Sequence, residues 1–306
     1  MATAAAGPVV IYLDQPEGRK LLSDVKDGRN GCYQPILHRI FSQQTTRAGC
    51  GIQSCALLLS ANAIGCRVNS SRQQRHVVTD AAQRQSVSTS IPVKRRKTDD
   101  DATEKTVHTK IHSPSQSLTL EQSNNKQPSP SEQDSLSSAV AGKGGYSVSN
   151  GLSNLPYTEV GLYSMPQTLS FTSRESVSSK GLTLADVAAI LQAHGCVVWV
   201  VHSALSTVNQ FRRDILDALS SADSCSGMVL NFHRGPLSTG EKARKSHHSP
   251  VVAYHKALDY ILVLDTAAPL ERHFWTSVDA MFTAMLTVDH VSGKSRGYCF
   301  FVKPTT

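Results

Sequence analysis

A long polar stretch divides this chain and limits how much of it can form a packed core. Residues 67–150 are rich in Ser, Gln, Thr and Asn and poor in large apolar side chains. Such a segment buries too little apolar surface to offset the entropy lost on ordering, so we predict a disordered insertion. Two foldable segments remain, residues 8–66 and residues 151–306, and we expect them to form two lobes of one domain.

The first segment is predicted to be a helical lobe. Residues 36–41 have the pattern of a short amphipathic helix, and residues 51–64 that of a buried helix that Gly65 would end. Cys50 stands directly ahead of the buried helix. The positive end of a helix dipole favours the thiolate, which is the nucleophilic form of cysteine. Cys50 is therefore a candidate nucleophile, and the side chain of Gln44 can donate a hydrogen bond beside it.

The second segment alternates helices and strands. We expect a helix capped by Thr183 and Asp186 and ended by Gly195, a buried strand over Cys196–Val201, a helix capped by Ser206, strands over residues 228–232, 250–254 and 260–264, a helix over residues 278–286 and a closing strand over residues 298–302. A helical lobe followed by a mainly antiparallel sheet gives the α+β fold class.

The strands predicted over residues 250–254 and 260–264 place a candidate general base near an acidic partner. A five-residue connection predicts that residues 250–254 and 260–264 form a hairpin, which brings His247 and Asp265 to the same edge of the sheet. Asp265 can then orient the imidazole so that its other nitrogen faces Cys50. Neighbouring side chains of a strand point to opposite faces, so we expect only one of His247 and His248 to serve. Alternatively, Asp265 simply begins a turn after a strand, which is common.

Seven segments resemble, in the right order, the catalytic domain of the phytochelatin synthase family. They are Pro16–Leu22, Phe41–Gln44 with Ala48–Gly51, Lys180–Thr183, Phe232–Gly235, His247–Pro250, Leu264–Ala267 with Trp275, and Ser292–Tyr298. The segment at His247 is similar to the family's His-Phe-Ser-Pro. The spacing from His247 to Asp265 also agrees with the family, and the resemblance covers most of the chain outside the polar stretch.

The resemblance implies a papain-like fold and an acyl transfer. Cys50 would be the nucleophile, His247 the general base and acid, and Asp265 the residue that orients His247. Gln44, with the backbone N–H of Cys50, would form the oxyanion hole. The family cleaves glycine from glutathione and transfers γ-glutamylcysteine to a second glutathione, with heavy-metal ions such as cadmium and zinc arriving as glutathione thiolates. We therefore expect no cofactor and no metal bound by the protein itself.

Two departures from the family pattern bear on that activity. Ala268 stands where the family has Arg, and Ser246 stands where it has Gly. We name Arg234 and Arg296 as candidate substrate-binding residues. The loss of Arg at position 268 favours a rival interpretation, a cysteine hydrolase of glutathione or its S-conjugates. A third interpretation is a non-catalytic interaction protein that works through the insertion.

Composition narrows the partners and the compartment. The net charge of +7 is typical of a solvated basic surface, and we expect no nucleic-acid partner. The seven cysteines are scattered, without a Cys-x-x-Cys motif, which argues against a structural zinc site and for a reducing compartment. No apolar run is long enough to span a membrane. We expect a cytoplasmic protein. Lys94–Lys97 is either a nuclear-import signal or a solvated charge patch, and formation of a homodimer stays open.

Overall fold

The computed structural model describes residues 10–28, 30–46, 48–67, 155–220, 226–237, 246–267 and 272–302. All of them belong to one compact unit. The predicted disorder of the polar stretch, the basic run Lys94–Lys97 and the position of Ala268 lie outside the described residues. Those three predictions are therefore not tested by the fold.

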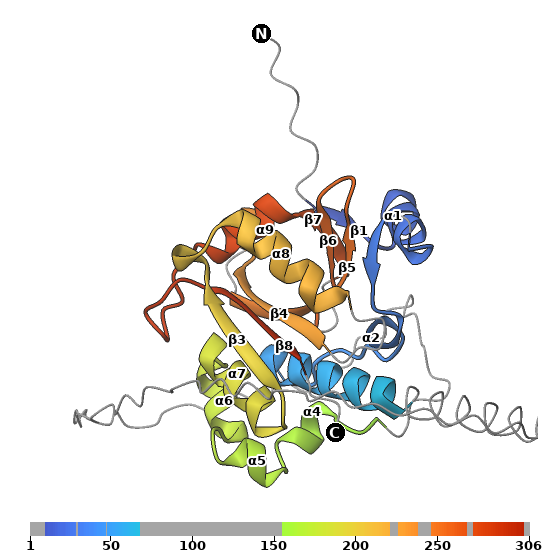
Figure 1. Ribbon diagram of the computed structural model, residues 1–306. Coiled ribbons are helices and arrows are strands. Elements are labelled where there is room, and N and C mark those ends of the chain that lie inside the picture. Colours follow the sequence, from blue (N-terminus) through green and yellow to red (C-terminus); the bar gives the residue numbers. More distant parts are fainter. Residues whose placement is uncertain are drawn as a thin grey trace, which may run out of the picture. The chain divides into compact units, whose positions relative to one another are not determined.

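The described residues contain an antiparallel sheet of eight strands (Figure 1). Its order is β1-β7-β6-β5-β4-β8-β3, and β2 pairs with β5 off this path. The strands are β1 (Val10–Tyr12), β2 (Gly31–Tyr33), β3 (Val197–His202), β4 (Ser226–His233), β5 (Ser246–His255), β6 (Tyr260–Val263), β7 (Phe274–Ser277) and β8 (Gly297–Val302). The predicted hairpin is confirmed, because β5 pairs with β6 in antiparallel register.

Helices connect the strands and cover the sheet. They are α1 (Pro16–Lys26), α2 (Pro35–Arg39), a helix over residues 50–67, α4 (Glu159–Leu162), α5 (Pro166–Leu169), α6 (Arg174–Lys180), α7 (Leu184–Ala193), α8 (Val208–Leu219) and α9 (Val278–Met285), with short 3-10 turns η1 (Ser203–Leu205) and η2 (Gly235–Leu237). Together with the sheet they confirm the α+β class. None of the helices in the described ranges is long and apolar enough to cross a membrane.

Alternate residues of the strands pack against different helices. Val229 and Val252 belong to a core shared with α7 and the helix over residues 50–67. Leu230 and Val251, their neighbours in β4 and β5, belong to a second core shared with α8 and α9. This alternation follows from the two-residue period of a strand. The sheet is therefore covered by helices on both faces.

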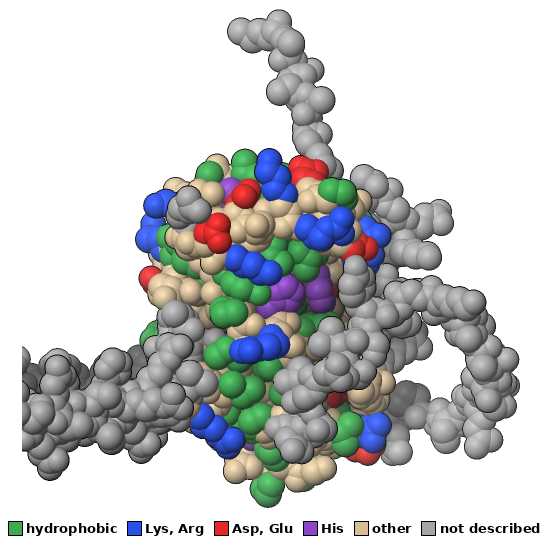
Figure 2. All heavy atoms as spheres, turned by 90° about the vertical axis from the view of Figure 1, so that its right-hand side faces the viewer, with side chains coloured by type: hydrophobic (Ala, Val, Ile, Leu, Met, Phe, Trp, Pro, Cys, Tyr) green, Lys and Arg blue, Asp and Glu red, His purple; other side chains and the backbone are tan. Residues whose placement is uncertain are grey.

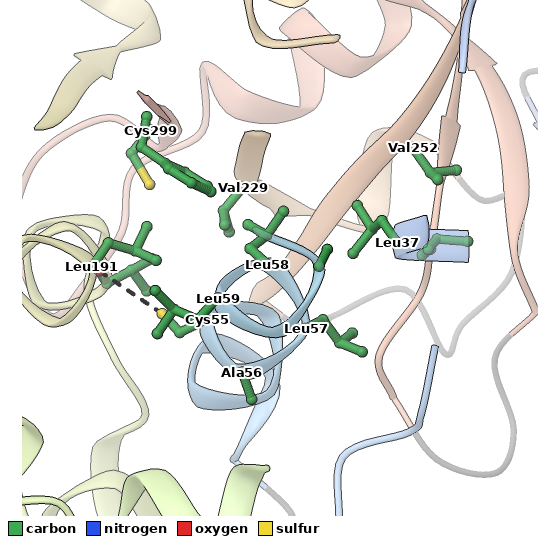
Figure 3. Close-up of a cluster of buried hydrophobic side chains, with 14 of the residues drawn as sticks. Leu37, Cys55, Ala56, Leu57, Leu58, Leu59, Leu191, Val229, Val252 and Cys299 are labelled. Atoms are coloured by element: carbon green, nitrogen blue, oxygen red, sulfur yellow. Dashed lines mark hydrogen bonds between the residues drawn. The ribbon is translucent and has the colours of Figure 1, made fainter. Parts of the chain in front are cut away.

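The helix over residues 50–67 is buried on nearly every side. Figure 3 shows Cys55 facing Leu191 of α7, whereas Leu58 faces Val229 of β4. A helix that is apolar all round is stable only when its surroundings cover it on all sides. This packing fixes the helix, and with it the position of Cys50 at its first turn.

Three local predictions are wrong. Gly65 does not end the buried helix, which continues to residue 67; a helical Gly costs only about 1 kcal/mol relative to Ala, less than the burial of this helix provides. The strand predicted over Cys196–Val201 is not buried, because β3 is an edge strand and Trp199 is 46% exposed. Thr207 rather than Ser206 caps α8, and its side chain accepts the hydrogen bond from Gln210 N.

The cap of α7 is confirmed in detail. The Thr183 hydroxyl accepts a hydrogen bond from the backbone N–H of Asp186, and the Asp186 carboxylate accepts one from the backbone N–H of Thr183. Gly195 follows the helix with a φ of 84°, a conformation that favours glycine. The sequence interpretation missed β1, β2 and β7, so the N-terminal segment is not purely helical.

Candidate active site

Cys50 is the first residue of the helix over residues 50–67, as the sequence predicts. The loop before it closes with a hydrogen bond from Gly49 N to Thr46 O, and the backbone N–H of Gln53 donates to Gly49 O at 2.8 Å. Cys50 is partly exposed, whereas the residues that follow it are buried. The thiol therefore lies at the positive end of a rigid helix.

His247 and Asp265 come together at one edge of the sheet. The imidazole Nε2 lies 2.9 Å from Asp265 Oδ1, and both side chains are buried. Asp265 also accepts a hydrogen bond of 2.7 Å from Arg234 Nη2 and one of 3.0 Å from the backbone N–H of Ala267. The carboxylate is thus fixed by an imidazole, a guanidinium and a backbone amide, and it holds the His247 ring in one orientation.

The thiol of Cys50 interacts with both neighbouring histidines. Its sulfur lies 3.9 Å from His248 Nδ1, and it also forms a side-chain hydrogen bond with His247. The expectation that only one of the two can serve assumed that opposite strand faces cannot reach one atom. That assumption does not hold, because Cys50 lies beside the first residues of β5 and both rings contact its sulfur. Only His247 carries the carboxylate partner, which distinguishes the two rings.

Electrostatics favour an ion pair between sulfur and imidazole. Burial raises the pKa of Cys50, but the charge of His247 and hydrogen bonds from both histidines outweigh it and hold that pKa well below its usual value. Burial lowers the pKa of His247, but Asp265 and the Cys50 thiolate raise it to about 9. Burial raises the pKa of Asp265, but His247 and Arg234 lower it to about 2. These shifts favour thiolate, imidazolium and carboxylate at the resting site.

The other predicted site residues have protein partners. The side-chain amide of Gln44 donates to Thr46 O at 2.8 Å, inside the loop that leads to Cys50. Arg234 binds Asp265, which makes it a neighbour of the candidate triad. Arg296 is buried; its guanidinium bonds Ser246, Thr287 and Val288, a set of contacts that anchors the start of β5.

Glu159 is a site neighbour that the sequence interpretation missed. Its buried carboxylate accepts hydrogen bonds from the hydroxyls and the backbone N–H groups of Thr45 and Thr46. A Cβ atom on Gly49 would lie 2.2 Å from Glu159 Oε1, so this loop also needs a glycine there. As an acidic residue in the first turn of α4, Glu159 resembles an ordinary helix-end charge, and no spacing rule links it to a loop more than a hundred residues earlier.

A group of partly exposed rings lies near Asp265. His273 packs against Phe41 with their ring centroids 4.3 Å apart, and His38 lies 6.5 Å from His273. Both histidines are partly exposed. Figure 2 shows histidine side chains in the middle of the face that lies to the right in Figure 1, with hydrophobic side chains around them. Asp265 acts electrostatically on His273, which places this group beside the candidate triad.

Comparison with known proteins assigns the part of the chain that carries His247 and Asp265. The phytochelatin synthase profile matches residues 156–298. Residues 156–298, just under half of the chain, are thus similar to a phytochelatin synthase domain. Cys50 lies outside the matched residues, and it is the structure that brings it to the two residues inside.

Three relatives agree with this assignment. Glutathione gamma-glutamylcysteinyltransferase 3 of Lotus japonicus is 32% identical over 130 residues, which is 42% of this chain and 26% of that protein. Glutathione gamma-glutamylcysteinyltransferase 1 of Arabidopsis thaliana is 28% identical over the same shares of both chains. Glutathione gamma-glutamylcysteinyltransferase of Schizosaccharomyces pombe is 25% identical over 127 residues, 41% of this chain and 29% of that protein. The chain spans little more than a quarter of the length of these relatives.

The described residues offer no ready-made metal site. Within them, no group of three or more His, Cys, Asp or Glu side chains is arranged to hold an ion. The contacts among Cys50, His247 and Asp265 supply the components of nucleophilic catalysis: a thiol with a lowered pKa, an imidazole and an orienting carboxylate.

Proposed function

We propose that this phytochelatin synthase domain catalyses acyl transfer from glutathione, with Cys50, His247 and Asp265 as a papain-like catalytic triad. The observation that carries the proposal is the chain of contacts from the Cys50 thiol through the His247 ring to Asp265 Oδ1. A nucleophile, a base and an orienting acid in that order are the arrangement of papain-like cysteine enzymes. The names of the relatives, glutathione gamma-glutamylcysteinyltransferases, support glutathione as the substrate.

The first half-reaction forms a thioester. The Cys50 thiolate attacks the carbonyl carbon of the amide that joins the cysteinyl and glycyl residues of glutathione. His247 gives its proton to the departing amine of glycine, and the carbon–nitrogen bond breaks. The γ-glutamylcysteinyl group is then bonded to the sulfur of Cys50, while Asp265 continues to hold the now neutral imidazole.

The tetrahedral oxyanion needs hydrogen-bond donors. We assign that role to the backbone N–H of Cys50, at the helix start, and to the side chain of Gln44. A side-chain amide carries two N–H groups, so the bond from Gln44 to Thr46 O does not preclude a second donation. One such donor contributes about 3–4 kcal/mol in enzymes where it has been removed.

The second half-reaction decides the product. The amine of a second glutathione attacks the thioester, His247 accepts its proton, and Cys50 leaves as thiolate, so that the peptide grows by one γ-glutamylcysteinyl unit. Attack by water would instead release γ-glutamylcysteine. Ala268, where the resembled family has Arg, favours a share of hydrolysis. Cadmium or zinc would arrive as a glutathione thiolate, which makes the metal part of the substrate.

The cellular setting follows from the thiols. None of the six described cysteines forms a disulfide, and a reactive thiolate persists in a reducing compartment. We therefore place the reaction in the cytoplasm.

Product analysis tests the proposal. The full chain is incubated with glutathione and cadmium, and the peptides are separated and weighed by mass spectrometry. Peptides longer than glutathione would establish transfer, and γ-glutamylcysteine with glycine alone would establish hydrolysis. Cys50→Ser should abolish both products, whereas Cys66→Ser, which changes another partly exposed cysteine, should not. Equal product from Cys50→Ser and the unaltered chain would refute the proposal, and no product from either would favour the interaction protein.

A further inference from the structure

We infer that His248 is a second catalytic residue, which donates a hydrogen bond to the Cys50 sulfur while His247 moves the protons. This inference deepens the proposed function, because it divides the work at the nucleophile between two imidazoles. The observations that carry it are the position of His248 on β5 and the contact of its Nδ1 atom with the sulfur.

The two histidines approach the sulfur from different faces of β5. His247 is paired in register with Phe232 of β4, and the two rings are 5.7 Å apart and nearly perpendicular. His248 is paired with Asn231, the neighbour of Phe232. Phe232 belongs to the core under α8 and α9, which leaves the Asn231 side of the strand facing the helix that begins at Cys50. His248 therefore reaches the sulfur from the nucleophile's own side.

The contact of Nδ1 with the sulfur selects the position of the proton on the His248 ring. Nε2 is buried and has no hydrogen-bond partner within the described part of the chain, and the same holds for Oδ1 of Asn231 opposite. Nε2 is left without a partner in either neutral tautomer, as a donor in one and as an acceptor in the other. The two tautomers differ at Nδ1, which lies 3.9 Å from the sulfur: a proton there donates to the thiolate, whereas a lone pair there would face its negative charge. The geometry thus favours the tautomer that donates to Cys50.

This arrangement gives the two rings different duties. His247 has Asp265 behind it and can alternate between imidazole and imidazolium. When His247 takes the proton of the attacking amine in the second half-reaction, the sulfur leaves as an anion. A hydrogen bond from His248 stabilises that anion without depending on the proton carried by His247. The ionisable groups that act on the sulfur are the two histidines and, more weakly, the hydroxyl of Tyr163 beside Thr46.

The test is the pH dependence of Cys50 alkylation, which needs no substrate. The rate of iodoacetamide labelling at Cys50 is followed by mass spectrometry from pH 4 to pH 10 in the full chain, in His248→Phe and in His248→Asn. Phe cannot donate, so the thiol pKa should rise by about one unit, a tenfold smaller thiolate fraction on the acid side. Asn places an amide N–H near the position of Nδ1 and should restore at least half of that shift.

Matched controls separate this role from a structural one. His255→Phe changes another buried histidine at the far end of β5 and should leave the profile unchanged. A profile of His248→Phe that overlays the unaltered chain would overturn the inference, and so would a His248→Asn profile no better than that of Phe. Because alkylation is independent of turnover, a shifted profile without peptide products would refute only the proposed function.

Discussion

Removing the charge of the Asp265 carboxylate should lower the pKa of His247 and slow turnover. In Asp265→Asn the side chain keeps its size but loses its charge, and its amide can donate to Nε2 of His247. That bond would leave the ring's own proton on Nδ1, the nitrogen that must accept a proton during catalysis. The equivalent change in a hydrolase triad lowers turnover about 10⁴-fold.

The size of the effect on His247 follows from its pKa. A rise from 6.5 to about 9 is worth about 3 kcal/mol at 1.36 kcal/mol per unit, and Asp265 is the largest cause that raises it. Because the folded-state pKa lies above the unfolded one, this contribution to stability is complete below pH 6.5 and is lost as the pH rises through about 9. Burial opposes the charged ring, so the His247 pKa should fall by at least one unit in the variant.

Nuclear magnetic resonance of the imidazole nitrogens, followed against pH, measures this directly. The alkaline limb of the pH–rate profile should move down with it, because His247 must be protonated to release glycine. Asp214→Asn is the matched control, since Asp214 is also buried but binds Tyr298 and Gln210. A His247 titration that is the same in Asp265→Asn and in the unaltered chain would refute the reasoning.

Three further substitutions test the packing around the site. Glu159→Gln should lower the free energy of unfolding in urea by about 1.5–3 kcal/mol, because a charged acceptor of buried hydrogen bonds is lost, and an unchanged midpoint would contradict this. Gly49→Ala should cut turnover about 100-fold while the circular dichroism spectrum stays unchanged. The added Cβ would lie 2.2 Å from Glu159 Oε1 and 2.4 Å from Thr46 Oγ1, and the resulting shift of the loop would displace the nucleophile. Full activity would contradict this, because it would show that the loop accommodates the methyl group. Trp275→Phe should lower the free energy of unfolding by about 1–3 kcal/mol, because it removes a hydrogen bond to α1 and leaves a cavity. Trp199→Phe, on the exposed edge strand, should lower it by less than about 0.5 kcal/mol. Equal losses in thermal unfolding would argue against the burial assigned to Trp275.

Patterns of local sequence predicted the larger elements and failed at the short ones. The cap at Thr183, the apolar helix after Cys50 and the β5–β6 hairpin all follow from signals within about fifteen residues. β1, β2 and β7 have three or four residues each, too few to show an alternating pattern. β3 is apolar along its whole length, and nothing in that run distinguishes an exposed edge from a buried centre.

The site residues also divide into those that local sequence predicts and those that depend on long-range packing. Cys50 could be found from its helix start, and His247 with Asp265 from the hairpin that joins them. The contacts of Glu159 with the nucleophile loop and of His248 with the sulfur depend on how distant segments pack, which no local pattern records. Strand alternation even argued against His248. The rule gives the direction of each side chain correctly, but at the end of a strand two neighbouring side chains on opposite faces can still contact the same atom.

The central claim is that the Cys50 sulfur carries the acyl group between the two half-reactions. Acid quenching of the full chain during turnover with glutathione and cadmium, followed by peptide mapping, measures this directly. The account predicts a mass increase of one γ-glutamylcysteinyl unit on the peptide that contains Cys50, lost when hydroxylamine cleaves thioesters. Turnover with an unmodified Cys50 peptide at every quench time, or the same adduct on all six described thiols, would contradict it.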